Sequence, residues 1–151
     1  MDSPPHPATG VFVGPRHLFP IRVFYEDTDL SGIVYHANYL KYCERARSEI
    51  LRQLGIDQRA AVEAGEGAYA VAEANIKFRR PARLDDALVI ESRATELGAA
   101  SVRMHQLVLR DGDILAEVAI RVGFVAPDGR PRRQPAAWRE AFEQFAAKGP
   151  E

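Results

Sequence analysis

The sequence is poor in the features that mark several common protein classes. Its 151 residues include one cysteine, Cys43, which excludes an intramolecular disulfide framework and is typical of a reducing compartment. The 20 basic and 21 acidic residues nearly cancel, which excludes a generally basic nucleic-acid-binding protein. No run approaches the roughly 18–20 consecutive apolar residues of a transmembrane segment, and no basic stretch followed by an apolar core marks a secretory signal. We therefore expect a cytoplasmic protein without a nucleic-acid partner.

Length and composition predict one folded unit. A chain of this size buries roughly 68–70% of its unfolded surface, and the hydrophobic fraction of 46% is ordinary for a globular protein. Residues 1–17 contain four prolines and little apolar pattern, which predicts a flexible leader. We expect a single domain over residues 18–147 and a frayed tail over residues 148–151.

Hydrophobic periodicity predicts two helices in the first half of the chain and one at its end. Apolar residues at three-and-four spacing over residues 39–54 indicate a long helix with one buried face, with Asn38 as its N-cap and Gly55 just beyond its end. A short helix is expected over residues 58–63. The terminal helix begins near Pro135 and carries its apolar stripe on Trp138, Ala141, Phe142 and Phe145.

Alternating apolar residues predict five strands. The expected strands cover residues 21–25, 70–78, 87–97, 101–109 and 114–124. The alanines at 70, 72 and 74 share one face with Ile76 and Phe78, so we expect a helix packed closely against that face. Short turns join the later strands, which must therefore be antiparallel. The fold class is α+β, an antiparallel five-stranded sheet wrapped around one long central helix.

Chemically, residues 25–39 are the most informative segment. Three carboxylates (Glu26, Asp27 and Asp29) and His36 precede the long helix, whose free N–H groups and positive dipole end favour a developing negative charge. A carboxylate there could attack a carbonyl or orient a water, which suits acyl transfer with a good leaving group. From spacing alone, the favoured alternative is an acidic turn beside a structural histidine. No His-x-x-x-His or paired-cysteine spacing supports a metal site, so we expect no metal and no cofactor.

Two motifs resemble a known family. The run RVFYEDTDLSGIVYHANYLKYCERARSEIL closely resembles the YbgC-type acyl-CoA thioesterases, within the 4-hydroxybenzoyl-CoA thioesterase branch of the hotdog superfamily. The segment FRRPARLDD over residues 78–86 is similar to the aromatic-x-x-P-A-x-L-D-D turn of that family. The resemblance covers roughly residues 20–145. It implies a hotdog fold, in agreement with the order of elements predicted from periodicity.

The resemblance also implies roles for individual residues. The catalytic aspartate falls on Asp29, as nucleophile or as general base for water, and its helpers fall on Tyr25 and His36. The N–H groups at the start of the long helix would hold the thioester oxygen. Asp27 would order the turn, and the charged run of residues 44–47 would lie on a solvated or subunit-facing side of the helix. Further substrate contacts are expected at Gly32, Val34, Tyr35, Asn38, Arg79 and Arg80, with the two arginines near the phosphates of coenzyme A.

The implied function is hydrolysis of an acyl-CoA thioester to a free acid and coenzyme A. The family's subunits pair edge to edge, so the resemblance implies a homodimer or homotetramer. An acyl carrier protein or proteins of the Tol–Pal envelope system are further expected partners. The acyl group stays open among short, long and aromatic ones. A non-catalytic module that binds acyl-CoA or acyl carrier protein is the main alternative, and a hydroxyacyl-thioester dehydratase is another.

Overall fold

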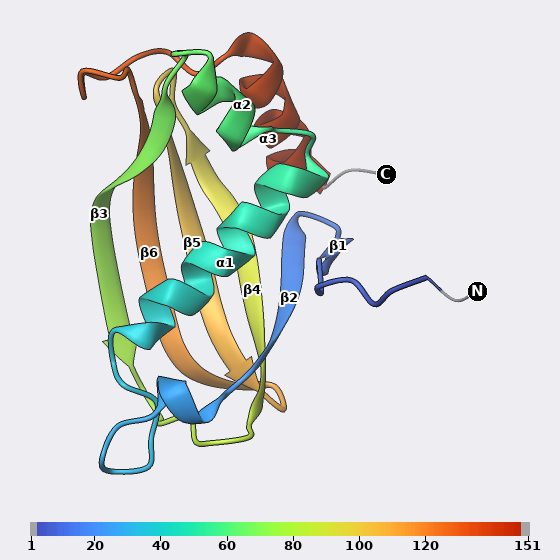
Figure 1. The fold of residues 1–151 in the computed structure, drawn as a ribbon, viewed down its shortest axis with the longest axis vertical. Helices are drawn as coiled ribbons and strands as arrows, with labels where there is room; N and C mark the ends of the chain where they lie inside the picture. The colour runs from blue at the N-terminus through green and yellow to red at the C-terminus, as the bar shows by residue number, and fades with distance from the viewer. Residues whose placement is uncertain (1–2, 149–151) are drawn as a thin grey trace.

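The framework of the protein is one antiparallel sheet of six strands, in the computed structural model that describes residues 3–148 (Figure 1). The spatial order is β1-β2-β4-β5-β6-β3, and every neighbouring pair is antiparallel. The strands are β1 (Val11–Val13), β2 (Arg16–Arg22), β3 (Ala68–Phe78), β4 (Ala87–Leu97), β5 (Ser101–Arg110) and β6 (Asp113–Val125). The helices are η1 (Tyr25–Asp27, a 3₁₀ turn), α1 (Asn38–Gln53), α2 (Gln58–Glu63) and α3 (Ala136–Lys148). The predicted α+β class is confirmed, with six strands in place of five.

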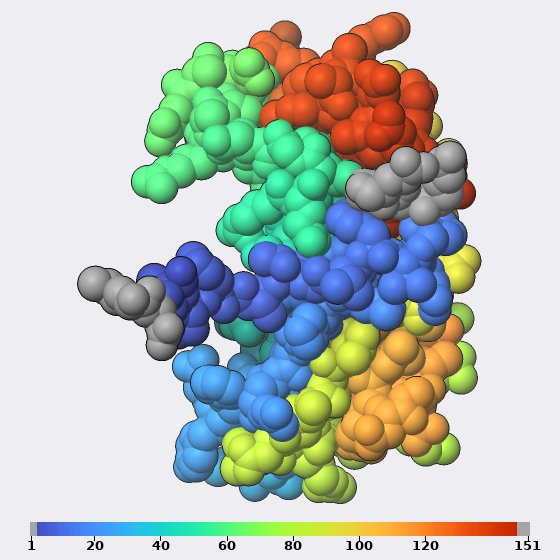
Figure 2. Space-filling model, turned by 90° about the vertical axis from the view of Figure 1, so that its right-hand side faces the viewer, coloured from blue at the N-terminus to red at the C-terminus, as the bar shows by residue number. Residues whose placement is uncertain are grey.

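The sixth strand comes from the segment predicted to be a flexible leader. Strands β1 and β2 form a tight hairpin, in which Phe12 packs edge-on against His17 and Phe145 at centroid distances of 4.8 and 5.4 Å. The prediction of a flexible leader is therefore wrong for residues 11–17. Strand β1 has only one inward apolar residue, Phe12, and with glycine and proline on either side so short a strand shows no alternating pattern in the sequence. Residues 3–9 are exposed, and Figure 2 shows the segment before β1 extending away from the body.

Helix α1 crosses one face of the sheet, in front of strands β4–β6 (Figure 1). Its inward residues follow the predicted spacing, and burying each larger apolar side chain contributes about 1.5–3 kcal/mol. Just past the helix, Gly55 adopts a φ of +80°, a left-handed conformation that glycine tolerates best. The predicted helix and its end are thus confirmed. The buried residues of α1 are Tyr39, Tyr42, Cys43, Ala46, Ile50 and Leu51.

Strand β3 lies at the outer edge of the sheet and is exposed over most of its length. A bulge between Val71 and Glu73 interrupts its pairing with β6, and the alternation of side chains shifts there by one residue. Tyr69 and Val71 therefore face the helix side, together with Phe78. The expectation of a single alanine face under a close helix is wrong, because the bulge changes the phase and α1 packs over β4–β6.

Helix α3 closes one end of the core against β2 and β4. Phe142 and Phe145 are buried, and Trp138 packs at a tilt against Tyr69 at a centroid distance of 5.8 Å. The predicted apolar stripe of this helix is confirmed. Of the predicted tail, Lys148 ends α3, and residues 149–151 lie outside the described part of the chain.

Candidate functional site

Asp27 organises the loop that leads into α1. Its side chain is buried and its Oδ2 accepts a hydrogen bond from the Phe24 N–H at 2.9 Å. Its backbone oxygen accepts from the Tyr35 N–H and from the Asn38 Nδ2, both at 2.9 Å. Asp27 thereby joins the beginning of the loop to its end, and the predicted turn-ordering role is confirmed.

Asp29 stands at the exposed tip of this loop. Its Oδ1 accepts the Ser31 N–H at 2.8 Å, its backbone N–H donates to Ile33 at 2.9 Å and its carbonyl accepts from Gly32 at 3.0 Å. Gly32 completes the turn with a φ of +78°, a conformation that strains residues with a side chain. The turn holds one carboxylate oxygen and leaves the other available.

The start of α1 presents free amide groups. Asn38 is the first helical residue, and its N–H donates to the Tyr35 oxygen at 2.9 Å. The N-cap prediction for Asn38 is therefore wrong, because its side chain is bound to Asp27 and the chain is already helical at Ala37. In the described chain, the N–H groups of His36 and Ala37 donate to no protein acceptor. These donors lie at the positive dipole end of a 16-residue helix.

A second turn, between β3 and β4, anchors the loop. The Val34 N–H donates to the Ala82 oxygen at 2.8 Å, and the Ala82 N–H donates to the Tyr39 hydroxyl at 3.0 Å. Within this turn Asp86 accepts from the Arg83 N–H at 2.8 Å and from Arg110 at 2.7 Å. Burial opposes ionisation of Asp86, but these two donors outweigh it and lower the pKa of its carboxyl.

The loop, the start of α1 and the end of β3 enclose a cleft of about 380 Å³. His36 lies on its wall, edge-on to Phe78 at a centroid distance of 6.4 Å. The cleft is lined by Asp29, Ile33, Val34, His36, Tyr39, Phe78, Arg79, Arg80 and Pro81. The fold thus brings five of the predicted site residues to one cleft, namely Asp29, Val34, His36, Arg79 and Arg80.

The other predicted site residues do not line this cleft. Tyr25 is 82% exposed and belongs to η1, and Gly32 lies at the loop tip. Tyr35 packs at a tilt against His36 at a centroid distance of 4.4 Å, on the exposed side of the loop, and the Asn38 side chain donates to the Asp27 backbone oxygen. In a single chain, these four residues shape the loop.

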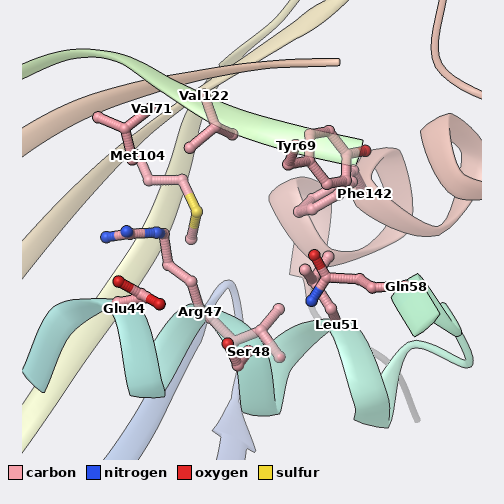
Figure 3. A pocket seen from close by; sticks show the side chains of 11 residues that line it. Glu44, Arg47, Ser48, Leu51, Gln58, Tyr69, Val71, Met104, Val122 and Phe142 are labelled. Atoms are coloured by element: carbon pink, nitrogen blue, oxygen red, sulfur yellow. The ribbon is translucent and has the colours of Figure 1, made fainter. Parts of the chain in front are cut away.

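A second cavity lies further along α1, between this helix and the inner side of β3 (Figure 3). We call it the Arg47 chamber. It has a volume of about 250 Å³. Its lining residues are Glu44, Arg47, Ser48, Ile50, Leu51, Gln58, Tyr69, Val71, Met104, Val122 and Phe142.

A buried polar network supports Arg47 in this chamber. Its Nη1 donates to the Gln106 Oε1 at 2.9 Å, and the Gln106 Nε2 donates to the Cys43 oxygen at 3.0 Å and the Ser92 Oγ at 2.9 Å. Gln106 and Ser92 are fully buried. Burial raises the pKa of Cys43 to about 12, so this thiol is inert. The sequence analysis missed this network, although Gln106 occupies an inward position between Met104 and Val108 that a polar residue rarely takes.

The expectation of a solvated or subunit-facing helix side over residues 44–47 holds in part. Glu44 and Arg45 are exposed, whereas Arg47 is half-buried and bound to Gln106. The sequence could not predict that Glu44 is exposed and Arg47 half-buried, because residues three apart share one face of a helix. How far each side chain is covered depends on the sheet against which the helix packs.

The main cleft can support a specific kind of chemistry. Asp29 and His36 line the same largely apolar cleft, so the Asp29 carboxylate can attack an electrophilic carbon there or accept a proton from water. The amide groups can hydrogen-bond an oxygen that becomes negative in the transition state. Within residues 3–148, no three His, Cys, Asp or Glu side chains gather closely enough to hold a metal ion. None of the described helices is long and apolar enough to cross a membrane.

Known proteins resemble this chain in sequence and structure. The thioesterase superfamily model matches residues 31–117. The chain is 39% identical to the acyl-CoA thioesterase YbgC of Haemophilus influenzae over 107 residues, which cover 71% of this chain and 79% of the relative. It is 38% identical to the acyl-CoA thioester hydrolase YbgC of Escherichia coli over 128 residues, which cover 83% and 95% of the two chains. The crystal structure of a probable thioesterase from Bartonella henselae matches with a TM-score of 0.75 at 37% identity, over 80% of this chain and 99% of that one.

Proposed function

Since this chain belongs to the thioesterase superfamily, we propose that it is an acyl-CoA thioesterase, which hydrolyses an acyl-CoA thioester to a free acid and coenzyme A. The observation that carries the proposal is the shared cleft, which is lined both by Asp29 and by His36, whose N–H group donates to no protein acceptor in the described chain. Hydrolysis of a thioester needs these two groups, a base or nucleophile and an oxyanion donor.

In the proposed reaction, the thioester oxygen accepts hydrogen bonds from the N–H groups of His36 and Ala37. Asp29 removes a proton from water as the water oxygen bonds to the thioester carbon, and the resulting oxyanion is held by the same amides. The carbon–sulfur bond then breaks, and the leaving thiolate takes up the proton. A thiol has a pKa of about 8.5, so its thiolate leaves without a strong acid.

A covalent route uses the same residues. The Asp29 carboxylate can attack the thioester carbon itself, which expels the thiolate and forms a mixed anhydride. Water then hydrolyses the anhydride and restores the carboxylate. Both routes require Asp29 and the helix amides. Trapping the anhydride with hydroxylamine in a single turnover distinguishes the two.

The remaining predicted residues support binding. His36 is proposed to orient the thioester beside Phe78. Arg79 and Arg80 are proposed to contact the phosphates of coenzyme A, although each already pairs with a carboxylate, Glu117 at 2.5 Å and Asp113 at 3.4 Å. A phosphate must therefore share or replace these partners. A helper role for Tyr25 requires a contact from a second subunit, since its ring is exposed in one chain.

We further propose a homodimer built through β3. This edge strand of 11 residues presents unpaired backbone groups along its outer side, which proteins normally cover or pair. Pairing two copies antiparallel about a two-fold axis continues the sheet and keeps both α1 helices on one face. Light scattering in solution will give twice the chain mass for the dimer and four times for a tetramer. The cytoplasmic location, an acyl carrier protein and the Tol–Pal proteins stay predictions.

A panel of acyl-CoA substrates monitored for thiol release tests the proposed activity. Asp29→Asn keeps the Oδ1 acceptor for Ser31, so the turn survives, and turnover should fall about 10²–10⁴-fold. Asp128→Asn is the matched control. The Asp128 Oδ1 accepts the Arg130 N–H at 3.0 Å, the same contact that Asp29 makes with Ser31, but Asp128 does not line the cleft.

Three outcomes would contradict the proposal in different ways. Unchanged turnover of Asp29→Asn removes Asp29 from the mechanism. Binding of acyl-CoA by the wild type without thiol release favours a non-catalytic module. Hydration of enoyl thioesters without thiol release favours a dehydratase.

A further inference from the structure

Arg110 and Asp86 form an ion pair in which both side chains are largely covered. The Arg110 Nη1 donates to the Asp86 Oδ2 at 2.7 Å, and the two side chains are 28% and 23% exposed. In every other ion pair within residues 3–148, at least one partner is more than a third exposed. Loss of hydration offsets much of the attraction in a covered pair, so its main effect is to fix where the two side chains lie.

The pair joins a rigid strand to a turn. Arg110 is the last residue of β5, a central strand that pairs with β4 on one side and with β6 on the other. Asp86 is the last residue of the turn between β3 and β4. The same Arg110 Nη1 also donates to the Pro81 oxygen at 3.1 Å, near the beginning of this turn. One guanidinium nitrogen on a rigid strand therefore holds the turn near both of its ends.

The turn depends on such support because part of its backbone is strained. Asp85 adopts a φ of +72°, in the left-handed region that costs free energy for a residue with a side chain. The Asp86 Oδ2 that accepts from Arg110 also accepts the Arg83 N–H at 2.8 Å, so this oxygen links the strand to the turn backbone. Without Arg110, a single backbone N–H would hold the Asp86 carboxylate.

This turn in its place holds both flanks of the loop that carries Asp29. Before the loop, the Val23 N–H donates to the Asp86 backbone oxygen at 2.9 Å. After the loop tip, the Val34 N–H donates to the Ala82 oxygen at 2.8 Å. Figure 1 shows the turn and the loop side by side at one end of the molecule. The place of Asp29 in the cleft therefore depends on the place of the turn.

We propose that Arg110 is a positioning residue for thioester hydrolysis, which holds the β3–β4 turn and, through the turn, the loop of Asp29. This inference rests on the proposed thioesterase function. Arg110 does not line the cleft, so it acts through the turn and not on the substrate. A misplacement of about 1 Å far from the reacting atoms can lower a rate about 100-fold. Arg79 and Arg80 keep their places without Arg110, because their N–H groups donate to the Leu115 oxygen of β6.

Hydrolysis of two thioesters tests this role, an acyl-CoA and the same acyl group on N-acetylcysteamine, which has no phosphates. Arg110→Met should lower kcat on the first and kcat/KM on the second about 10- to 100-fold, with KM for acyl-CoA changed less than about threefold. Arg110→Lys should restore part of the loss, because one ammonium nitrogen can replace the one nitrogen that makes both contacts. Arg16→Met is the matched control. Arg16 is 36% exposed, pairs with Glu91 at 3.6 Å at the other end of β2 from Val23, and should keep the wild-type kcat.

Hydrogen exchange measures directly whether the loop is released. In Arg110→Met, the backbone N–H groups of Val23 and Val34, which donate to the turn, should exchange at least about tenfold faster than in the wild type. Amides in the middle of α1, such as that of Ala46, should keep the wild-type rate. The experiment is made at a temperature where circular dichroism shows all variants folded, and it does not require thiol release.

The outcomes separate this inference from the proposed function. A wild-type kcat in Arg110→Met, or a lowered kcat with unchanged exchange at Val34, overturns the role of Arg110 and leaves the thioesterase standing. A loss confined to acyl-CoA overturns it too, because Arg110 would then contact a phosphate of coenzyme A. An equal loss in Arg16→Met would assign the effect to general destabilisation and not to the turn. A wild type that releases no thiol from any acyl-CoA overturns the proposed function and this inference with it.

Discussion

Two tyrosines of α1 lie three residues apart and differ in one interaction. Both Tyr39 and Tyr42 are buried, at 3% and 0% exposure. The Tyr39 hydroxyl accepts the Ala82 N–H at 3.0 Å, whereas the Tyr42 hydroxyl has no hydrogen-bond partner among the described residues. Replacing each tyrosine with phenylalanine removes a buried hydroxyl, which is hydrogen-bonded in Tyr39 and unpaired in Tyr42. The difference between the two variants therefore measures how much the hydrogen bond to Ala82 contributes to stability.

We expect Tyr39→Phe to lower the stability of the protein and Tyr42→Phe to leave it unchanged or raise it. Tyr39→Phe leaves the buried Ala82 N–H without an acceptor and should lower the free energy of unfolding by about 1–3 kcal/mol. For a chain of this size that shifts the melting temperature by roughly 2–4 °C per kcal/mol. Tyr42→Phe removes an unpaired buried hydroxyl and should leave stability unchanged or raise it by up to about 1 kcal/mol. Since Ala82 also accepts the Val34 N–H, Tyr39→Phe should lower kcat as well.

Urea unfolding at one fixed protein concentration provides the assay, because an oligomer's stability depends on concentration. Hydrolysis of one acyl-CoA substrate by the same samples reports the effect on the cleft. Burial and the nearby Asp27 carboxylate both raise the pKa of Tyr42. A loss of stability in Tyr42→Phe as large as in Tyr39→Phe would refute the reasoning and identify Asp27 as an acceptor for the Tyr42 hydroxyl.

Two further predictions concern the loop and the core. Gly32→Ala forces a side chain into a φ of +78° with open space around it, so backbone strain of about 1–2 kcal/mol should displace Asp29 and lower kcat at least about tenfold. Gly14→Ala, at a φ of +58° in the β1–β2 turn, should cost similar stability and leave kcat unchanged in the same assays. Burial lowers the pKa of His17 below 6.5, so the unfolded chain binds a proton there more readily, and stability should fall as pH drops below 6.5. Urea midpoints at pH 7.5 and 5 should differ less in His17→Gln, and an unchanged difference would count against a neutral buried His17.

Local patterns sufficed for most elements. The spacing of apolar residues in α1 and the position of Gly55 predict the helix and its end, because both depend on neighbours within a few residues. The turn at Asp111 and Gly112 is also confirmed, and both residues adopt positive φ, as a two-residue hairpin requires. Such features need no knowledge of distant parts of the chain.

The errors arose where distant contacts override a local pattern. Strand β1 contributes one inward side chain, Phe12, whose burial depends on α3 at the far end of the chain. The bulge in β3 follows from its pairing with β6 and turns Ala70 away from the face that Ala74 shares with Ile76 and Phe78. Asn38 has the composition of an N-cap, but its side chain is occupied by Asp27 eleven residues earlier.

The candidate site divides in the same way. The sequence by itself determined a carboxylate, a glycine turn and a helix start within residues 25–39, because these groups are joined by a short stretch of backbone. Tertiary structure alone decided which of them face a cleft, since Phe78 and Pro81 supply its opposite wall from another part of the sheet. It alone also decided that Arg47 meets Gln106 and Ser92, because the packing of α1 on β4 and β5 brings these distant polar groups together in the core.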